Sequence, residues 1–242
     1  MKQMPSLATH IPSSFDGHST LDIVSVLDRA RIQLSAGPSE FIFDAALGQC
    51  LREDEAAAQS HLHEDFMIGR PLRRAAVLVG IVARDVPTLL LTQRTEHLPS
   101  HAGQIAFPGG KLEPGDADPI AAAKREAREE IGLGDEFIEP IGFLDALRTH
   151  TGFHVDPVVA LVQPGFSLTI DPSEVAEAFE VPLAFLMDGA NHHLQSLERD
   201  GRIRHFYTMP YESRFIWGAT AAMIRNMQLR LFPSDTCPRI TR

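Results

Sequence analysis

Three glutamates that could bind a metal ion stand together between residues 125 and 133. If this segment is helical, Glu126, Glu129 and Glu130 occupy positions i, i+3 and i+4 and share one face of the helix. Carboxylates at that spacing repel one another, and Mg²⁺ or Mn²⁺ would relieve the repulsion because these ions take oxygen ligands. Arg125 can pair with Glu129 one turn further on. The spacing therefore indicates a metal site, and the alternative is a charged helix face in solvent.

The loop before these glutamates adds groups that suit a phosphate ligand. Gly109 and Gly110 let the backbone approach a ligand closely, and Glu113 and Asp116 place further oxygens beside the start of the expected helix. A strand, a glycine loop and an acidic helix thus follow one another along the chain. This order favours a site for metal and phosphate over a solvated helix face.

The acidic helix is expected over residues 116–134, where Asp118 can cap its start, Pro119 suits its first position and Gly132 can end it. The strands expected around it are 73–85, 88–94, 104–110, 137–147 and 153–163. A short strand and a helix that opens near Pro182 follow, then two paired strands in 205–218 and a last helix over 219–232. Helices and strands mix without a regular βαβ order, which predicts an α+β sandwich with a mixed sheet between helices.

Outside this region the sequence indicates structure rather than chemistry. Residues 20–34 have the apolar spacing of an amphipathic helix, and a second helix is expected from Asp44 to about Ser60. Residues 1–18 are expected to form a loose tail. Phe215 and Trp217 are expected in the core, and the alternative is a pair that stacks on an adenine ring.

The composition describes an acidic globular protein. The chain has 242 residues, of which 44% are hydrophobic, and a formal net charge of −10, so it can close a core but disfavours nucleic acid as a partner. Cys50 and Cys237 lie far apart and are expected to be free thiols. The sequence has no apolar run typical of a signal peptide or a membrane span, so we expect a cytoplasmic protein without membrane contact.

The segment from Gly110 to Leu133 resembles the signature of the Nudix hydrolases. That signature runs Gly, five residues, Glu, seven residues, Arg-Glu, an apolar residue, any residue, Glu-Glu, any residue, Gly and an apolar residue. The matching residues are Gly110, Arg125, Glu126, Ala127, Glu129, Glu130, Gly132 and Leu133. Asp116 stands where the first Glu belongs, and one additional residue separates it from Arg125. Both departures resemble the coenzyme A diphosphatase branch of the family.

A second stretch, residues 90–110, is similar to a region peculiar to the coenzyme A diphosphatases. The shared residues are Leu90-Leu91-Thr92, Arg94, Gly103 and Phe107-Pro108-Gly109-Gly110. Thr95 replaces the usual Ser or Ala, and Pro99 replaces the usual Arg. Residues 215–221 are similar to the end of these proteins, so the resemblance covers roughly 70–232. We therefore expect an N-terminal tail and helical extension over 1–70, a Nudix domain over 71–232 and a C-terminal tail over 233–242.

The resemblance implies a Nudix fold and a reaction in which water attacks one phosphorus of a diphosphate while Mg²⁺ or Mn²⁺ binds its oxygens. In the coenzyme A branch the products are 4′-phosphopantetheine and adenosine 3′,5′-bisphosphate. Glu126, Glu129 and Glu130 would be the metal ligands, with Glu126 and Glu130 foremost, and Arg125 would orient a glutamate.

The general base is left open between a glutamate of the signature and an acid on a distant loop, for which Glu174 and Glu177 are candidates. The 3′-phosphate of coenzyme A calls for a cationic contact, with Arg94 foremost and a surface salt bridge as the alternative. The candidate substrate contacts are Arg94, Arg73, Arg74, Lys111, His101, Gly109 and Gly110.

Two other functions remain open on the sequence. One is hydrolysis of a different small nucleotide substrate, such as ADP-ribose, a dinucleotide or a noncanonical nucleoside triphosphate. The other is a Nudix module that binds a nucleotide without cleaving it, which the presence of Glu126, Glu129 and Glu130 disfavours. A homodimer is the assembly that the family suggests.

Overall fold

The structure is a computed structural model that describes residues 21–44, 49–52, 72–149, 151–199 and 202–232. A mixed sheet lies at its centre, with strands in the order β10-β4-β3-β9-β7. These strands are β3 (Arg73–Val82), β4 (Thr88–Arg94), β7 (Ile138–Phe143), β9 (Phe153–Val162) and β10 (Val175–Pro182). β3 and β9 run parallel, whereas the other neighbours are antiparallel. Three short strands extend this sheet: β5 (Ile105–Ala106) on β4, β6 (Gly109–Lys111) on β3 and β8 (Leu147–Arg148) on β9.

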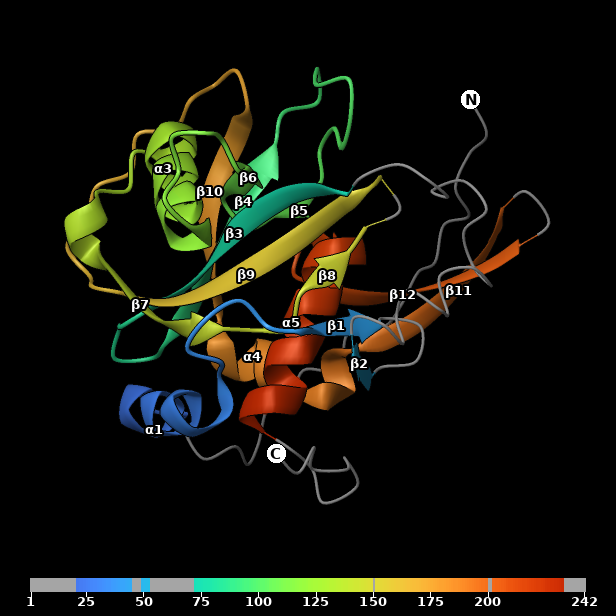
Figure 1. Cartoon of the computed structure of the whole chain (residues 1–242), viewed down its shortest axis with the longest axis horizontal. Helices are drawn as coiled ribbons and strands as arrows, with labels where there is room; N and C mark the ends of the chain where they lie inside the picture. Colours follow the sequence, from blue (N-terminus) through green and yellow to red (C-terminus); the bar gives the residue numbers. More distant parts are fainter. Residues whose placement is uncertain (1–20, 45–48, 53–71, 150, 200–201, 233–242) are drawn as a thin grey trace.

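Helices cover both faces of this sheet, as the sequence predicts for an α+β sandwich. Figure 1 shows α3 (Pro119–Ile131) on one face, and α1 (Ile23–Gln33), α4 (Leu183–Met187) and α5 (Gly218–Leu231) on the other. Two short 3₁₀ helices, η1 (Asp135–Phe137) and η2 (Gly189–Asn191), lie in connections. Because side chains alternate along β3, Leu78 packs under α3 while Val79 packs toward α5. The long β-branched runs therefore fill a core on each side.

The helix with the three glutamates forms where the sequence predicts it. It begins after Asp118, whose carboxylate accepts a hydrogen bond from the backbone N–H of Ala121, and Pro119 occupies its first position. It ends at Gly132, which adopts a left-handed conformation with φ of 67° and donates to the carbonyls of Ala127 and Arg128. Local capping thus fixes both ends of α3.

Two predicted strands are each divided in the structure. Residues 104–110 form β5 and β6 rather than one strand, because the first part pairs with β4 and the second with β3, with Pro108 between them. Residues 137–147 likewise divide into β7 and β8. The crossing from β4 to β3 places Gly109 and Gly110 beside the middle of the sheet.

The helix predicted from Asp44 to about Ser60 is wrong within the described residues. Instead β1 (Phe41–Asp44) and β2 (Gln49–Arg52) form an antiparallel pair. The backbone N–H of Phe43 donates to the carbonyl of Ala146 at 2.8 Å, and Ile42 and Phe43 are buried. This pairing with the segment after β7 outweighs the helical propensity of the sequence. Residues 1–20, 45–48, 53–71 and 233–242 lie outside the described part, as do the side chain of Cys50 and all of Cys237.

The segment between α1 and β2 belongs to the same core as the main sheet. Val26, Ala30, Leu34 and Phe43 pack in one cluster with the buried residues of α5. Asp145, which is 1% exposed, accepts hydrogen bonds from Ser39, Asn226 and Arg230. A single buried carboxylate thus connects the N-terminal segment with the last helix.

A separate three-stranded sheet follows η2 and comprises β11 (His193–Arg199), β12 (Arg202–Tyr211) and β13 (Arg214–Trp217). The predicted pairing of β12 and β13 is present, and β11 is an additional strand. Phe215 and Trp217 were expected in the core, but they are 51% and 40% exposed. Because successive side chains point to opposite faces, burial of Ile216 turns both aromatic rings outward.

No helix among the described residues is long and apolar enough to cross a membrane.

Candidate active site

The three glutamates of α3 differ in exposure although they share one region of the helix. The side chain of Glu130 is 5% exposed and that of Glu126 is 16% exposed, whereas that of Glu129 is 58% exposed. The alanines of α3 pack on β3, so Glu126 and Glu130 lie at the edge of the buried face. These two carboxylates form the inner pair, and Glu129 lies outside them.

The glycine pair on β6 lies directly against this inner pair. Gly109 and Gly110 pair with Val77 and Ala76 of β3. The backbone N–H of Gly109 approaches Oε2 of Glu130 at 3.4 Å, and a Cβ atom at Gly110 would collide with the Glu126 carboxylate. A side chain at position 110 would therefore have to displace the Glu126 carboxylate from its present place.

Arg125 connects the loop with the acidic helix. Its guanidinium donates to both oxygens of Asp116 at 3.0 Å, and its Nη1 atom donates to Glu126 and Glu129 at 3.0 Å each. The Nη2 atom also donates to the carbonyl of Lys111 at 3.0 Å. The sequence predicts only the contact with Glu129. Hydrogen bonding to Arg125 holds the pKa of Asp116 below its usual value, so this carboxylate stays ionised as the anchor of Arg125.

A second arginine reaches the site from the end of β4. The guanidinium of Arg94 lies 3.7 Å from Oε1 of Glu130 and 3.7 Å from Oε2 of Glu174. Glu174 is held there because β10 pairs with β4, and the backbone N–H of Thr95 donates to its carbonyl at 3.0 Å. Glu177, the other candidate base, instead pairs with Arg214 at 2.6 Å. The structure brings Glu174 to the inner glutamates and engages Glu177 elsewhere.

Burial and mutual repulsion alter the acidity of the inner pair. Burial raises the pKa of Glu130 to about 8, against the opposing effect of Arg94. Burial also raises the pKa of Glu126, and Arg125 opposes this shift while Glu129 and Glu174 add to it. A buried and a partly buried carboxylate with raised pKa values are groups that a cation would stabilise in the ionised form.

The donor chemistry fits a hard divalent cation. Glu126 and Glu130 offer carboxylate oxygens, which are the ligands that Mg²⁺ and Mn²⁺ prefer. Both side chains have low exposure, and Glu126 lies against the backbone of Gly110. As the side chains lie, no three acidic, histidine or cysteine groups in the described ranges converge on one point. Glu126 instead pairs with Arg125, and Glu130 lies beside Arg94. Binding a cation would require these ion pairs to rearrange.

We call Glu126, Glu129, Glu130 and Glu174 the acidic cluster. Of the other predicted substrate contacts, some lie near this cluster and others do not. His101 is exposed in the loop after β4, and its Nδ1 atom lies 2.7 Å from Oε1 of Gln104. Lys111 is exposed at the end of β6, next to the site. Arg73 lies over the ring of Phe153, and Arg74 bonds Asp156 at 2.6 Å. Both partners are on β9, across β3 from the glycine pair, so the structure does not bring Arg73 and Arg74 to the glutamates.

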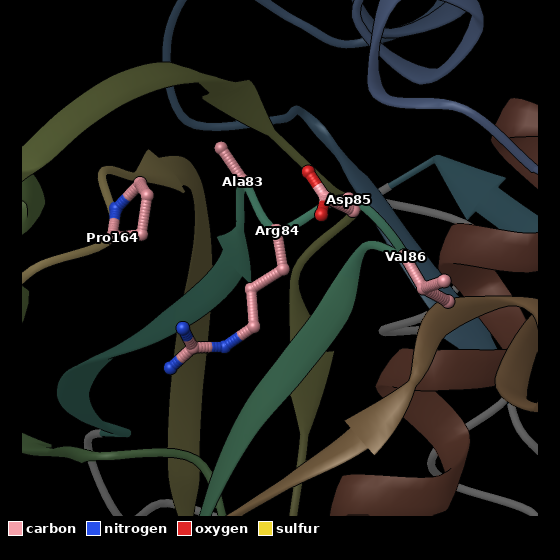
Figure 2. A pocket seen from close by; sticks show the side chains of 5 residues that line it. All are labelled: Ala83, Arg84, Asp85, Val86 and Pro164. Carbon is pink, nitrogen blue, oxygen red and sulfur yellow. The ribbon is translucent and has the colours of Figure 1, made fainter.

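A shallow hollow lies at the opposite end of β3. Ala83, Arg84, Asp85, Val86 and Pro164 line it. Figure 2 shows the first four side chains along the turn after β3, with Pro164 facing them from the segment after β9. It shares no residue with the acidic cluster, and Arg84 is engaged by Glu180 at 2.6 Å. This hollow is therefore separate from the glutamates of α3 and the glycine pair.

Comparison with protein families and curated proteins gives consistent matches. A model of the NUDIX domain matches residues 71–199. The chain is 43% identical over 155 residues to a protein from Yersinia pestis strain Pestoides F named "Uncharacterized Nudix hydrolase NudL". This alignment covers 64% of the chain and 78% of the relative. The protein of the same name from Yersinia pseudotuberculosis serotype O:1b matches with the same identity and coverage.

Solved structures of similar proteins match at lower identity. An Ap4A hydrolase binary complex from C. elegans has a TM-score of 0.40 at 23% identity, over 46% of this chain and 80% of that one. The NUDIX domain of NrtR from Shewanella oneidensis, complexed with ADP ribose, has a TM-score of 0.38 at 20% identity, over 52% of this chain and 83% of that one.

Proposed function

Because this chain belongs to the Nudix hydrolase family, we propose that it cleaves the diphosphate bond of coenzyme A or one of its derivatives. The products would be 4′-phosphopantetheine and adenosine 3′,5′-bisphosphate. The observation that carries the hydrolytic part is the pair of buried Glu130 and partly buried Glu126 against the backbone of Gly109 and Gly110. The substrate part rests on the similarity of residues 90–110 to coenzyme A diphosphatases.

In this proposal Glu126 and Glu130 hold Mg²⁺ or Mn²⁺, and Glu129 is an outer ligand. A divalent cation bound there supplies charge neutralisation at the diphosphate and activates water for attack on phosphorus. Arg125, anchored by Asp116, fixes the orientation of Glu126. The absence of a side chain at Gly110 leaves room for this carboxylate directly against the backbone of β6. The protein thus contributes position and charge rather than a covalent nucleophile.

Glu174 is the proposed acceptor of the proton from the attacking water. Its side chain is 49% exposed, so water reaches it, and it lies near enough to Glu126 and Glu130 to raise their pKa values. Arg94 provides the cationic contact to a phosphate oxygen of the substrate. Lys111 and His101, which are both exposed, would contact more distant phosphates.

A direct product assay tests both parts of the proposal. Purified protein with Mg²⁺ or Mn²⁺ is incubated with coenzyme A, ADP-ribose and diadenosine tetraphosphate in parallel, and the products are separated by ion-exchange chromatography. We expect coenzyme A to be cleaved with the highest kcat/KM. A preference for ADP-ribose or the dinucleotide would contradict the proposed substrate but would still support hydrolase activity. Binding without turnover across all three would contradict catalysis and favour a nucleotide-binding module.

A further inference from the structure

Two arginines contact the acidic cluster, and they are held in very different ways. Arg125 has contacts of 3.0 Å to Asp116, Glu126 and Glu129 and to a backbone carbonyl. Arg94 has two ion-pair distances of 3.7 Å, and its guanidinium makes no hydrogen bond with any residue in the described part of the chain. Only the first set of distances is typical of charge-assisted hydrogen bonds. Arg125 is therefore fixed, whereas Arg94 is held by charge alone.

The position of Arg94 is between two carboxylates that come from different elements. Glu130 lies on α3 and is 4% exposed, and Glu174 precedes β10 and has a half-exposed side chain. The Arg94 side chain itself is 24% exposed, so one side of it faces solvent. A guanidinium in this place neutralises part of the charge of the buried glutamate and has an open path away from it.

We propose that Arg94 and a divalent cation compete for Glu130, and that the arginine displaced by the cation becomes the contact for a substrate phosphate. We refer to the Arg94 guanidinium between Glu130 and Glu174 as the Arg94 bridge. This inference rests on the proposed metal-dependent function and adds an order of events to it. A cation on the Glu130 carboxylate repels the guanidinium, which then turns toward the solvent side where a diphosphate would enter.

The competition predicts opposite effects of one substitution on two binding steps. Arg94→Gln removes the competing charge and keeps a polar side chain, so Mn²⁺ should bind the substrate-free protein more tightly. The same substitution removes the phosphate contact, so KM for a diphosphate substrate should rise. An arginine that only stabilised the fold, or only prepared Glu130 for the metal, would not change the two quantities in opposite directions.

The test measures free Mn²⁺ by electron paramagnetic resonance during titration of metal-stripped, full-length protein. We expect Arg94→Gln to lower the Mn²⁺ dissociation constant by about tenfold. Arg94→Lys keeps the charge but loses the forked guanidinium that spans two carboxylates. Its Mn²⁺ dissociation constant should lie between those of wild type and Arg94→Gln. The matched control is Arg128→Gln, which removes an arginine from α3, the helix that carries Glu130. Arg128 pairs with Asp135, outside the acidic cluster. It should stay within about twofold of wild type.

Three results would contradict the Arg94 bridge. Unchanged or weaker Mn²⁺ binding by Arg94→Gln overturns it, and so does equal tightening by Arg128→Gln, which would reflect net charge alone. Wild-type protein that binds no Mn²⁺ overturns the bridge together with the proposed function. Wild-type binding with an unaffected Arg94→Gln variant overturns the bridge only. Circular dichroism of each variant confirms folding, and Arg94→Lys carries the comparison if Arg94→Gln does not fold.

Discussion

At the scale of single residues, Glu130 combines the features that a metal ligand and a buried acid require. Its side chain is 5% exposed, it contacts the backbone of Gly109, and burial raises its pKa to about 8. A carboxylate in such a place costs free energy unless a positive charge is near. Arg94 meets this requirement in part, and a divalent cation would meet it more fully.

Substitution of Glu130 by Gln separates catalysis from folding. The amide has the same shape but no charge, so the fold should remain while the proposed metal site loses its most buried ligand. We expect kcat to fall by about 100-fold or more, since charge stabilisation by a metal amounts to several kcal/mol. Steady-state assays with a thermal melt of each protein measure both effects.

The comparison variant is Glu129→Gln, because the Glu129 side chain is 58% exposed and lies outside the inner pair. The loss of kcat in Glu129→Gln should be clearly smaller than the loss in Glu130→Gln. Near-normal turnover by Glu130→Gln would refute the assignment of this residue as a metal ligand. Equal losses in both variants would refute the distinction between inner and outer glutamates.

Some residue roles could be read from the sequence and others could not. The spacing of Glu126, Glu129 and Glu130 is local, so their shared helix face follows from it. The contact between Arg94 and Glu174 depends on the pairing of β4 with β10, which joins distant parts of the chain. The acidic residue Asp116 in the loop was a possible sign of a partner for Arg125. Whether its side chain reaches Arg125 depends on how the loop turns, which the local sequence does not specify.

At the scale of elements, α3 is the platform that positions the site. Its N-terminal cap is one hydrogen bond of 2.8 Å from the Ala121 N–H to Asp118, and its C-terminal cap is Gly132 in the left-handed region. Both signals are local, and this is why the limits of α3 could be predicted. β1 and the division of 104–110 depend on backbone partners from elsewhere, so local sequence could not predict them.

Removal of the N-terminal cap tests how far α3 stability depends on it. Asp118→Ala should lower the free energy of unfolding by about 1 kcal/mol, because the N–H of Ala121 loses its partner. Urea denaturation followed by circular dichroism measures the change. Lys124→Ala in the middle of the same helix is the control and should remain within about 0.5 kcal/mol of wild type. A cost for Lys124→Ala as large as that for Asp118→Ala would exclude the cap as the cause.

At the scale of the whole molecule, unfolding in acid should depend on Asp156. This residue of β9 is 1% exposed and bonds Arg74 on β3 at 2.6 Å, with His154 at 3.4 Å. Burial by itself would raise the pKa of Asp156, but the contacts with His154 and Arg74 outweigh it and hold the pKa below 3.8. Because the pKa of Asp156 is lower in the folded than in the unfolded chain, the ionised carboxylate stabilises the fold at pH values above the unfolded pKa of about 3.9. This stabilisation is lost as the pH falls through the pKa of the folded state.

Asp156→Asn removes this contribution. We expect the variant to be less stable than wild type at neutral pH, and the difference in unfolding free energy should shrink as the pH drops below about 4. Urea unfolding between pH 7 and pH 2.5 measures the two curves. Parallel curves over this range would show that Asp156 has an ordinary pKa in the folded protein.

The shared core of the first and last helices also has a meaning for the protein as it is made. Val26 and Ala30 of α1 pack with Ile224 and Met227 of α5, and Arg29 donates to the carbonyl of Leu231 at 3.2 Å. During translation the ribosome adds α5 only after the main sheet has been synthesised. The apolar face of α1 therefore stays without its partner while more than half of the protein is still being translated, and this exposed interval is when the nascent chain would be most open to a chaperone or to aggregation.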